Sequence, residues 1–126
     1  MHETEPGAML GLATAQFRKG DTGAAGATLD HLFADRDFSS AETDLLAARI
    51  LEASGRLPEA LSAYERLSVT YPGEEAQSRM ALLLQRTGAE QRARAIFVEI
   101  CKSVERAPTF YRRAQREWYE IARRHA

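Results

Sequence analysis

The chain has 126 residues, 28% of them charged, and a net charge of −1, which fits one soluble domain with a modest core. No apolar run approaches the roughly 20 residues that a membrane-spanning helix needs. The start, "MHETEPGAML", lacks the charged and apolar regions of a signal peptide. The single cysteine, Cys101, excludes an internal disulfide and favours a reducing compartment.

The charge is distributed unevenly along the chain. Residues 1–75 contain six Lys and Arg against thirteen Asp and Glu, a net charge of −7. Residues 76–126 contain eleven Lys and Arg against five Asp and Glu, a net charge of +6. Two interpretations stay open: two solvated faces of opposite sign, or a dipolar molecule that attracts an acidic partner to its C-terminal half.

Apolar residues recur at helical spacing and predict seven helices in chain order. Their expected ranges are 8–19, 22–35, 40–54, 58–71, 74–87, 90–106 and 109–124. The first six helices form three units with common landmarks, because glycines at 20, 55 and 88 are 35 and 33 residues apart. An alanine precedes each glycine and another follows it five residues later: Ala13 and Ala25, Ala48 and Ala60, Ala81 and Ala93.

These landmarks predict a helix–turn–helix hairpin in every unit. The alanines allow the two helices to approach closely, and large residues four and seven positions after the second alanine fill the space beside them. The large residues are Leu29 and Leu32, Tyr64 and Leu67, and Phe97 and Ile100. The glycines stand where a helix ends and φ is often positive.

Local signals support several helix ends. Ser39 and Glu42 have the spacing of a capping box for the third helix. Pro58 falls in the first turn of the fourth helix, where its missing N–H costs little. Pro72 ends that helix, because its ring disfavours helical geometry at Tyr71.

One further helix follows Pro108. It carries an apolar stripe at helical spacing, formed by Tyr111, Ala114, Trp118 and Ile121. Such a helix is typical of the element that covers the open end of a repeat array. Trp118 has a second interpretation as an aromatic platform for a ligand, although its place in the stripe favours core packing.

The units resemble the tetratricopeptide repeat (TPR), a helix–turn–helix of roughly 34 residues with the pattern W-x₂-L-G-x₂-Y, A-x₃-F, P. The middle unit matches at Leu51, Gly55, Ala60, Tyr64 and Pro72. The third unit matches at Met80, Ala81, Leu84, Ala93 and Phe97, and the first at Leu12, Ala13, Ala25 and Leu29. The resemblance implies an all-α TPR-like solenoid in a single domain, with repeats at about 7–38, 40–73 and 74–107 and a capping helix at 109–125.

A narrower resemblance rests on the order of four segments, "GLATAQF", "ALSAYERL", "YPGEEAQSRMALLLQRTG" and "APTFYRRAQREWYEIAR". Together they are similar to the soluble tail of small bacterial membrane proteins, in which a hydrophobic segment resembling the phospholipase D N-terminal module precedes the repeats. The resemblance implies a cytoplasmic fragment, tethered to the inner membrane through a segment that this chain does not contain.

We find no catalytic constellation in the sequence and expect neither an enzyme nor a bound cofactor or metal. His2, His31 and His125 form no H-x₃-H or H-E-x-x-H pair, and His31 is interpreted as a surface or capping residue. Cys101 follows Ile100 on the packing face and is expected to be a small buried hydrophobe. No glycine-rich phosphate loop or nucleophile elbow occurs.

The expected function is therefore protein–protein interaction, with a peptide or protein segment in the groove lined by the first helices of the units. The residues of these helices that lie off the packing stripe mix arginines with apolar side chains, which suits an acidic peptide. The expected groove residues are Phe17, Arg18, Arg49, Glu52, Arg79, Leu82, Arg86, Arg112, Arg116 and Tyr119. An ordinary solvated inner face is the alternative interpretation.

A second function class is kept beside this one. The C-terminal end combines six arginines from 106 onward with Tyr111, Trp118 and Tyr119, a composition that suits a single-stranded nucleic acid or another acidic partner. The acidic N-terminal half and the isoelectric point near 6.3 argue against nucleic acid. The sequence leaves the oligomeric state open.

Overall fold

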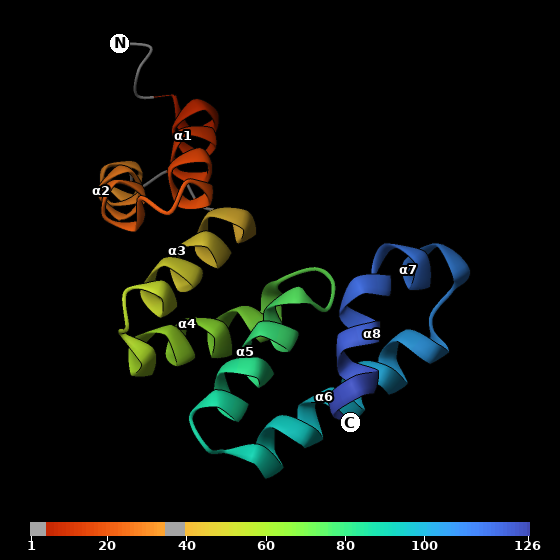
Figure 1. The fold of residues 1–126 in the computed structure, drawn as a ribbon. Coiled ribbons are helices and arrows are strands. Elements are labelled where there is room, and N and C mark those ends of the chain that lie inside the picture. Colours follow the sequence, from red (N-terminus) through yellow and green to blue (C-terminus); the bar gives the residue numbers. More distant parts are fainter. Residues whose placement is uncertain (1–4, 35–39) are drawn as a thin grey trace. The chain divides into compact units, whose positions relative to one another are not determined.

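The computed structural model describes residues 5–34 and 40–126, and all regular structure within these ranges is helical. The helices are α1 (Pro6–Arg18), α2 (Thr22–Phe33), α3 (Ala41–Ala53), α4 (Leu57–Thr70), α5 (Glu75–Arg86), α6 (Glu90–Arg106), α7 (Thr109–Ala114) and α8 (Arg116–His125) (Figure 1). The all-α prediction is thereby confirmed, with the first six helices close to their expected ranges.

The prediction of one continuous closing helix at 109–124 is wrong, because the chain breaks at Gln115 into α7 and α8. Gln115 has φ −101° and ψ 14°, outside helical geometry. Its side-chain carbonyl accepts a hydrogen bond from the backbone N–H of Glu74 at 2.8 Å. Gly73 admits this side chain, since a Cβ at Gly73 would lie 3.0 Å from the Gln115 amide. A tertiary contact thus sets the break, and no local breaker residue marks it.

The chain divides into two compact units, residues 1–63 and 64–126, with the boundary inside α4. In the N-terminal unit α1 and α2 form the first hairpin, and α3 packs against α2. Ala13 and Ala25 are 0% exposed, as expected for the alanines of a tight hairpin. The core of this unit is completed by larger side chains: Met9, Leu29, Leu32, Leu46 and Ile50.

The glycine turns have the backbone geometry that the sequence predicts. Gly20, Gly55 and Gly88 have φ of +87°, +81° and +95°, a region that side chains with a Cβ rarely adopt. The N-cap of α3 is Ser40, whose hydroxyl accepts from the Thr43 N–H at 3.0 Å. The capping box expected from Ser39 falls on a residue outside the described ranges.

In the C-terminal unit α5 and α6 form a hairpin, and α8 packs mainly against α6 and also contacts α5. The core contains the expected landmarks, all nearly or fully buried: Tyr64, Leu67, Ala81, Ala93, Phe97 and Ile100. The expected stripe of the closing helix is only partly correct, because Ala114 is exposed and Trp118 and Ile121 are half-buried. Ala122 is the buried residue of α8 instead, and its small size allows α8 to lie close to its neighbours.

Candidate functional site

The residues expected to line a groove fall in both units, and each unit is described by itself. In the N-terminal unit the guanidinium of Arg49, on α3, lies over the ring of Phe17, on α1, at 5.0 Å from its centroid. This cation–π contact holds an arginine against an apolar surface. Glu52 is half-buried one turn after Arg49, and Arg18 is exposed in the last turn of α1.

The C-terminal unit holds a second arginine of this kind. Arg79, on α5, lies over the ring of Trp118, on α8, at 5.1 Å from its centroid. Its Nε donates to Glu75, one helical turn earlier, at 2.8 Å. Within the described part of the chain, the two Nη groups of Arg79 have no protein partner. The side chain is therefore held in place on two sides while its terminal donors stay available for a carboxylate.

The other expected residues of this unit lie around α5 and the closing segment. Leu82 is half-buried and Arg86 exposed, both on α5 beyond Arg79. Arg112 is exposed and lies 3.4 Å from the Thr109 hydroxyl, and Arg116 pairs with Glu120 at 3.2 Å.

Tyr119 is directed toward α6, where its hydroxyl donates to Glu105 at 2.6 Å and Arg123 lies 5.9 Å from its ring centroid. The hydrogen bond to Glu105, followed by burial, raises the pKa of the Tyr119 hydroxyl. The structure thus brings Trp118, rather than Tyr119, beside the expected residue Arg79.

A polar cluster around the buried Glu74 attaches the closing segment to α6. Glu74 is 6% exposed, and its carboxylate accepts from the hydroxyl of Tyr111 and, at 3.2 Å, from that of Ser103. Burial, followed by the hydrogen bond to Glu74 and its negative charge, raises the pKa of Tyr111 above its usual value. Because the backbone N–H of Glu74 also donates to Gln115, this one residue fixes α6, α7 and the start of α8.

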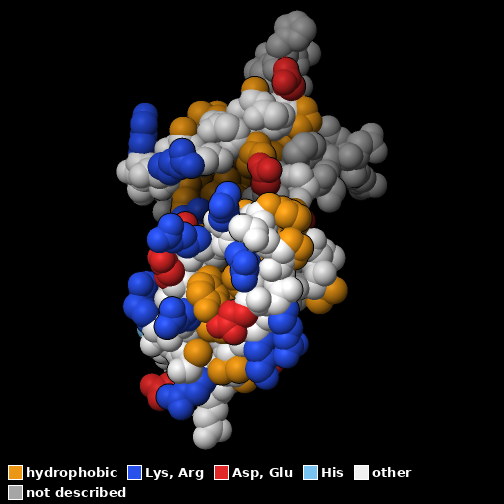
Figure 2. Space-filling view, turned by 90° about the vertical axis from the view of Figure 1, so that its right-hand side faces the viewer, with side chains coloured by type: hydrophobic (Ala, Val, Ile, Leu, Met, Phe, Trp, Pro, Cys, Tyr) orange, Lys and Arg blue, Asp and Glu red, His pale blue; other side chains and the backbone are white. Residues whose placement is uncertain are grey.

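The C-terminal unit has a cationic surface. Figure 2 shows Lys and Arg side chains gathered over the lower part of the face that α7 and α8 present to the viewer. Exposed arginines of this unit include Arg106, Arg113 and Arg124, beyond the expected Arg112 and Arg116. Such a surface attracts acidic partners over a distance of about one Debye length, roughly 8 Å at physiological ionic strength.

The described ranges contain no cluster of metal-binding side chains. No set of three or more His, Cys, Asp or Glu that could hold a metal ion occurs there. His125 is stacked on Phe97, with ring centroids 5.2 Å apart, and its Nδ1 lies 3.2 Å from the amide nitrogen of Gln85. Cys101 is half-buried, not fully buried as expected, and burial raises the pKa of its thiol.

The described helices include none that is long and apolar enough to cross a membrane. The tethering segment implied by the narrower resemblance thus stays a prediction.

Comparison with known proteins gives a structural likeness. A solved structure of SycD, the type III secretion translocator chaperone of Yersinia enterocolitica in an alternative dimer, matches with a TM-score of 0.70. The match covers 94% of this chain and 91% of that chain at 18% sequence identity. The fold is a TPR-like helical repeat. No protein-family model matches the chain, and no curated protein matches it either.

The sequence analysis did not identify two contacts of Arg79, its ion pair with Glu75 and its stack on Trp118. The Glu75–Arg79 pair has the i, i+4 spacing of a helical ion pair, so it was detectable. The stack of Arg79 on Trp118 joins residues 39 positions apart, and no local pattern indicates that contact.

Proposed function

We propose that this chain is a non-catalytic scaffold that binds an acidic segment of another protein. Its TPR-like fold supports the proposal, because such repeats present long surfaces to extended or helical peptides. The SycD structure, which shares this fold, is described as that of a type III secretion translocator chaperone.

The observation that carries the proposal is the state of Arg79. Its side chain is 26% exposed and its guanidinium is stacked on Trp118. Because Glu75 binds only Nε, the two Nη groups form a pre-positioned fork for a carboxylate of the partner. A side chain that is already ordered loses little entropy on binding, so the contact favours affinity.

The other expected groove residues extend this site in our proposal. Leu82 offers an apolar contact one turn along α5, and Arg86, Arg112 and Arg116 add positive charge. We propose a corresponding surface on the N-terminal unit, formed by Phe17, Arg18, Arg49 and Glu52. The partner segment we propose therefore carries carboxylates spaced around at least one apolar side chain.

Binding of single-stranded nucleic acid is less well supported. Base stacking needs exposed aromatic faces. Trp118 is already covered by Arg79, and Tyr119 is bound to Glu105 and lies beneath Arg123. Phe110, beside Arg112 and Arg113, is an exposed aromatic side chain of this segment. One exposed ring among several exposed arginines suits acidic side chains better than a run of stacked bases.

The experiment has two steps: the full chain captures its partner, and the purified partner is then titrated against variants of the chain. Proteins captured from a bacterial lysate are identified by mass spectrometry, re-expressed and titrated by calorimetry. Arg79→Lys keeps the charge but removes the planar fork, and we expect it to weaken binding by about tenfold, since a charge-assisted hydrogen bond contributes roughly 1.5–3 kcal/mol. Arg94→Lys, on an exposed position of α6, is the matched control. Equal loss in both variants would contradict a site at Arg79.

A further inference from the structure

A pocket of about 460 Å³ lies between α2 and α3 in the N-terminal unit. Its α2 side has little side-chain volume, because Gly23, Gly26 and Ala27 line it there. Apolar side chains form its walls: Leu29, Phe33, Ala47, Ile50 and Leu51. The volume falls within the roughly 300–1,000 Å³ of pockets that hold ligands or side chains.

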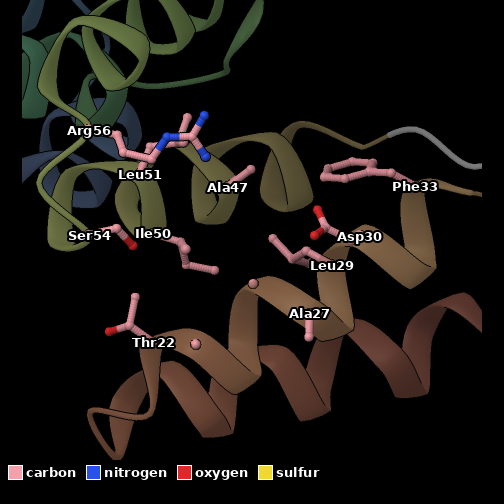
Figure 3. Close-up of a pocket in the computed structure, with 12 residues that line it drawn as sticks. Thr22, Ala27, Leu29, Asp30, Phe33, Ala47, Ile50, Leu51, Ser54 and Arg56 are labelled. Carbon is pink, nitrogen blue, oxygen red and sulfur yellow. The ribbon is translucent and has the colours of Figure 1, made fainter.

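Charges of opposite sign stand at the rim of this pocket. Asp30 is exposed at the end near Phe33, and the Arg56 side chain extends along the opposite wall (Figure 3). Arg56 is already held by Glu59, with its Nε 3.1 Å from the carboxylate. Asp30 is therefore the rim charge that an incoming group can meet, and it favours a cation.

The pocket is separate from the proposed groove. It is lined on α3 by Ala47 and Leu51, each two residues from Arg49. Two residues correspond to about 200° around an α-helix. The pocket thus faces nearly away from Arg49, and an inference about it does not rest on the proposed function.

The chain itself carries a group of matching chemistry. Phe110, on α7, is 75% exposed, far above what an aromatic residue normally leaves in water. Arg112 and Arg113 follow it directly and are exposed. Residues 1–63 contain five Lys and Arg against ten Asp and Glu, whereas residues 106–126 contain six against two. The segments that carry the two features therefore have opposite net charge, and an exposed aromatic ring is of a chemistry that apolar pocket walls accept.

We propose that the α2–α3 pocket of one copy of this chain receives Phe110 of a second copy, with an arginine of α7 meeting Asp30 at the rim. The contact joins two different surfaces, so it is heterologous. A pair of chains leaves one pocket and one Phe110 unused, so further chains can add. Assemblies are therefore expected to grow with protein concentration, unless the rotation between successive chains closes a ring.

Sedimentation velocity of the full chain measures this association. Protein concentrations from about 1 µM to 1 mM cover the dissociation constants of weak interfaces. The wild type is expected to shift to larger species with concentration. Phe110→Ala is expected to raise the dissociation constant at least about tenfold, as for an aromatic anchor residue. Val69→Ala, which removes another apolar side chain that is 85% exposed, is the control and should change nothing.

A mixing experiment tests the pairing itself. Gly26→Leu fills the pocket from its α2 side, where a Cβ would lie 3.7 Å from Ile50, an ordinary contact. Gly23→Leu is a second variant, since nothing lies within 4 Å of its Cβ position. Both replace glycine inside a helix, so we expect them to fold. Alone, Phe110→Ala and either filled variant should stay monomeric, but mixed they should form a one-to-one complex.

The mixture works because one protein keeps the pocket and the other keeps Phe110. Asp30→Lys, introduced into the protein that keeps the pocket, should raise the dissociation constant of the mixed complex at least about tenfold. Added salt should raise the dissociation constant of the unsubstituted complex, because it screens the contact between Asp30 and the arginine. A wild type that stays monomeric up to 1 mM overturns the proposal. So does an association that Phe110→Ala leaves intact, or a mixture that stays monomeric, since another occupant of the pocket or another interface would then be responsible.

Discussion

Tyr111→Phe tests the polar cluster that holds the closing segment. The substitution removes the hydroxyl that donates to Glu74 and leaves the 6%-exposed carboxylate with the Ser103 hydroxyl at 3.2 Å. A hydrogen bond to a charged group contributes about 1.5–3 kcal/mol. At about 4 °C per kcal/mol for a chain of this size, we expect Tm to fall by about 6–12 °C.

Urea unfolding followed by circular dichroism measures the loss, with Tyr119→Phe as the matched control. Tyr119 also donates to a carboxylate, but its partner Glu105 is exposed, so the control should cost less than about 0.5 kcal/mol. A loss in Tyr111→Phe that is no larger than in the control would refute the role of the cluster.

The pH dependence gives an independent check on Tyr111. Its pKa is raised in the folded state above the value of about 10 in the unfolded chain. A raised pKa contributes stability that is fully present below the unfolded pKa and is lost as pH rises through the folded pKa. The stability difference between wild type and Tyr111→Phe should therefore be constant below about pH 9 and shrink above about pH 10. A difference that grows above pH 10 would contradict this assignment.

Three further predictions follow from the packing. Ala60 is 0% exposed, so Ala60→Leu should overpack the interior and cost about 1–3 kcal/mol, and an unchanged melting curve would contradict the helical register. The raised thiol pKa and partial burial of Cys101 should make its native labelling with a thiol reagent slow at neutral pH and fast in urea. Deleting residues 108–126 should expose the side of α6 that α8 covers and give an aggregating or molten chain, with Trp118→Ala a milder form. A monomeric truncated chain with the parent's melting curve would show that the closing segment is no cap.

The hairpins were predictable because their determinants are local. Each hairpin carries its landmarks within 20 residues: two alanines, a glycine between them, and a large residue one turn after the second alanine. In the structure the alanines and large residues are buried and the glycines have positive φ, as expected. The same local logic placed Pro58 and Pro72 at the two ends of α4.

The closing segment was predicted less well because distant contacts shape it. The break at Gln115 depends on Glu74, 41 residues earlier. The burial of Ala122 in place of Ala114 follows from how α8 meets α6, which helical spacing alone does not determine. The pocket between α2 and α3 likewise depends on how closely these two helices pack, which the local sequence does not determine.

The most direct test of the scaffold proposal is the affinity of the identified partner for three forms of the chain, measured by calorimetry at physiological salt. Wild type and Arg94→Glu should bind alike, whereas Arg79→Glu should bind at least about a hundredfold more weakly, because a carboxylate would then face the carboxylates of the partner. Retained affinity in Arg79→Glu, or an equal loss in Arg94→Glu, would contradict a binding site centred on the Arg79–Trp118 stack.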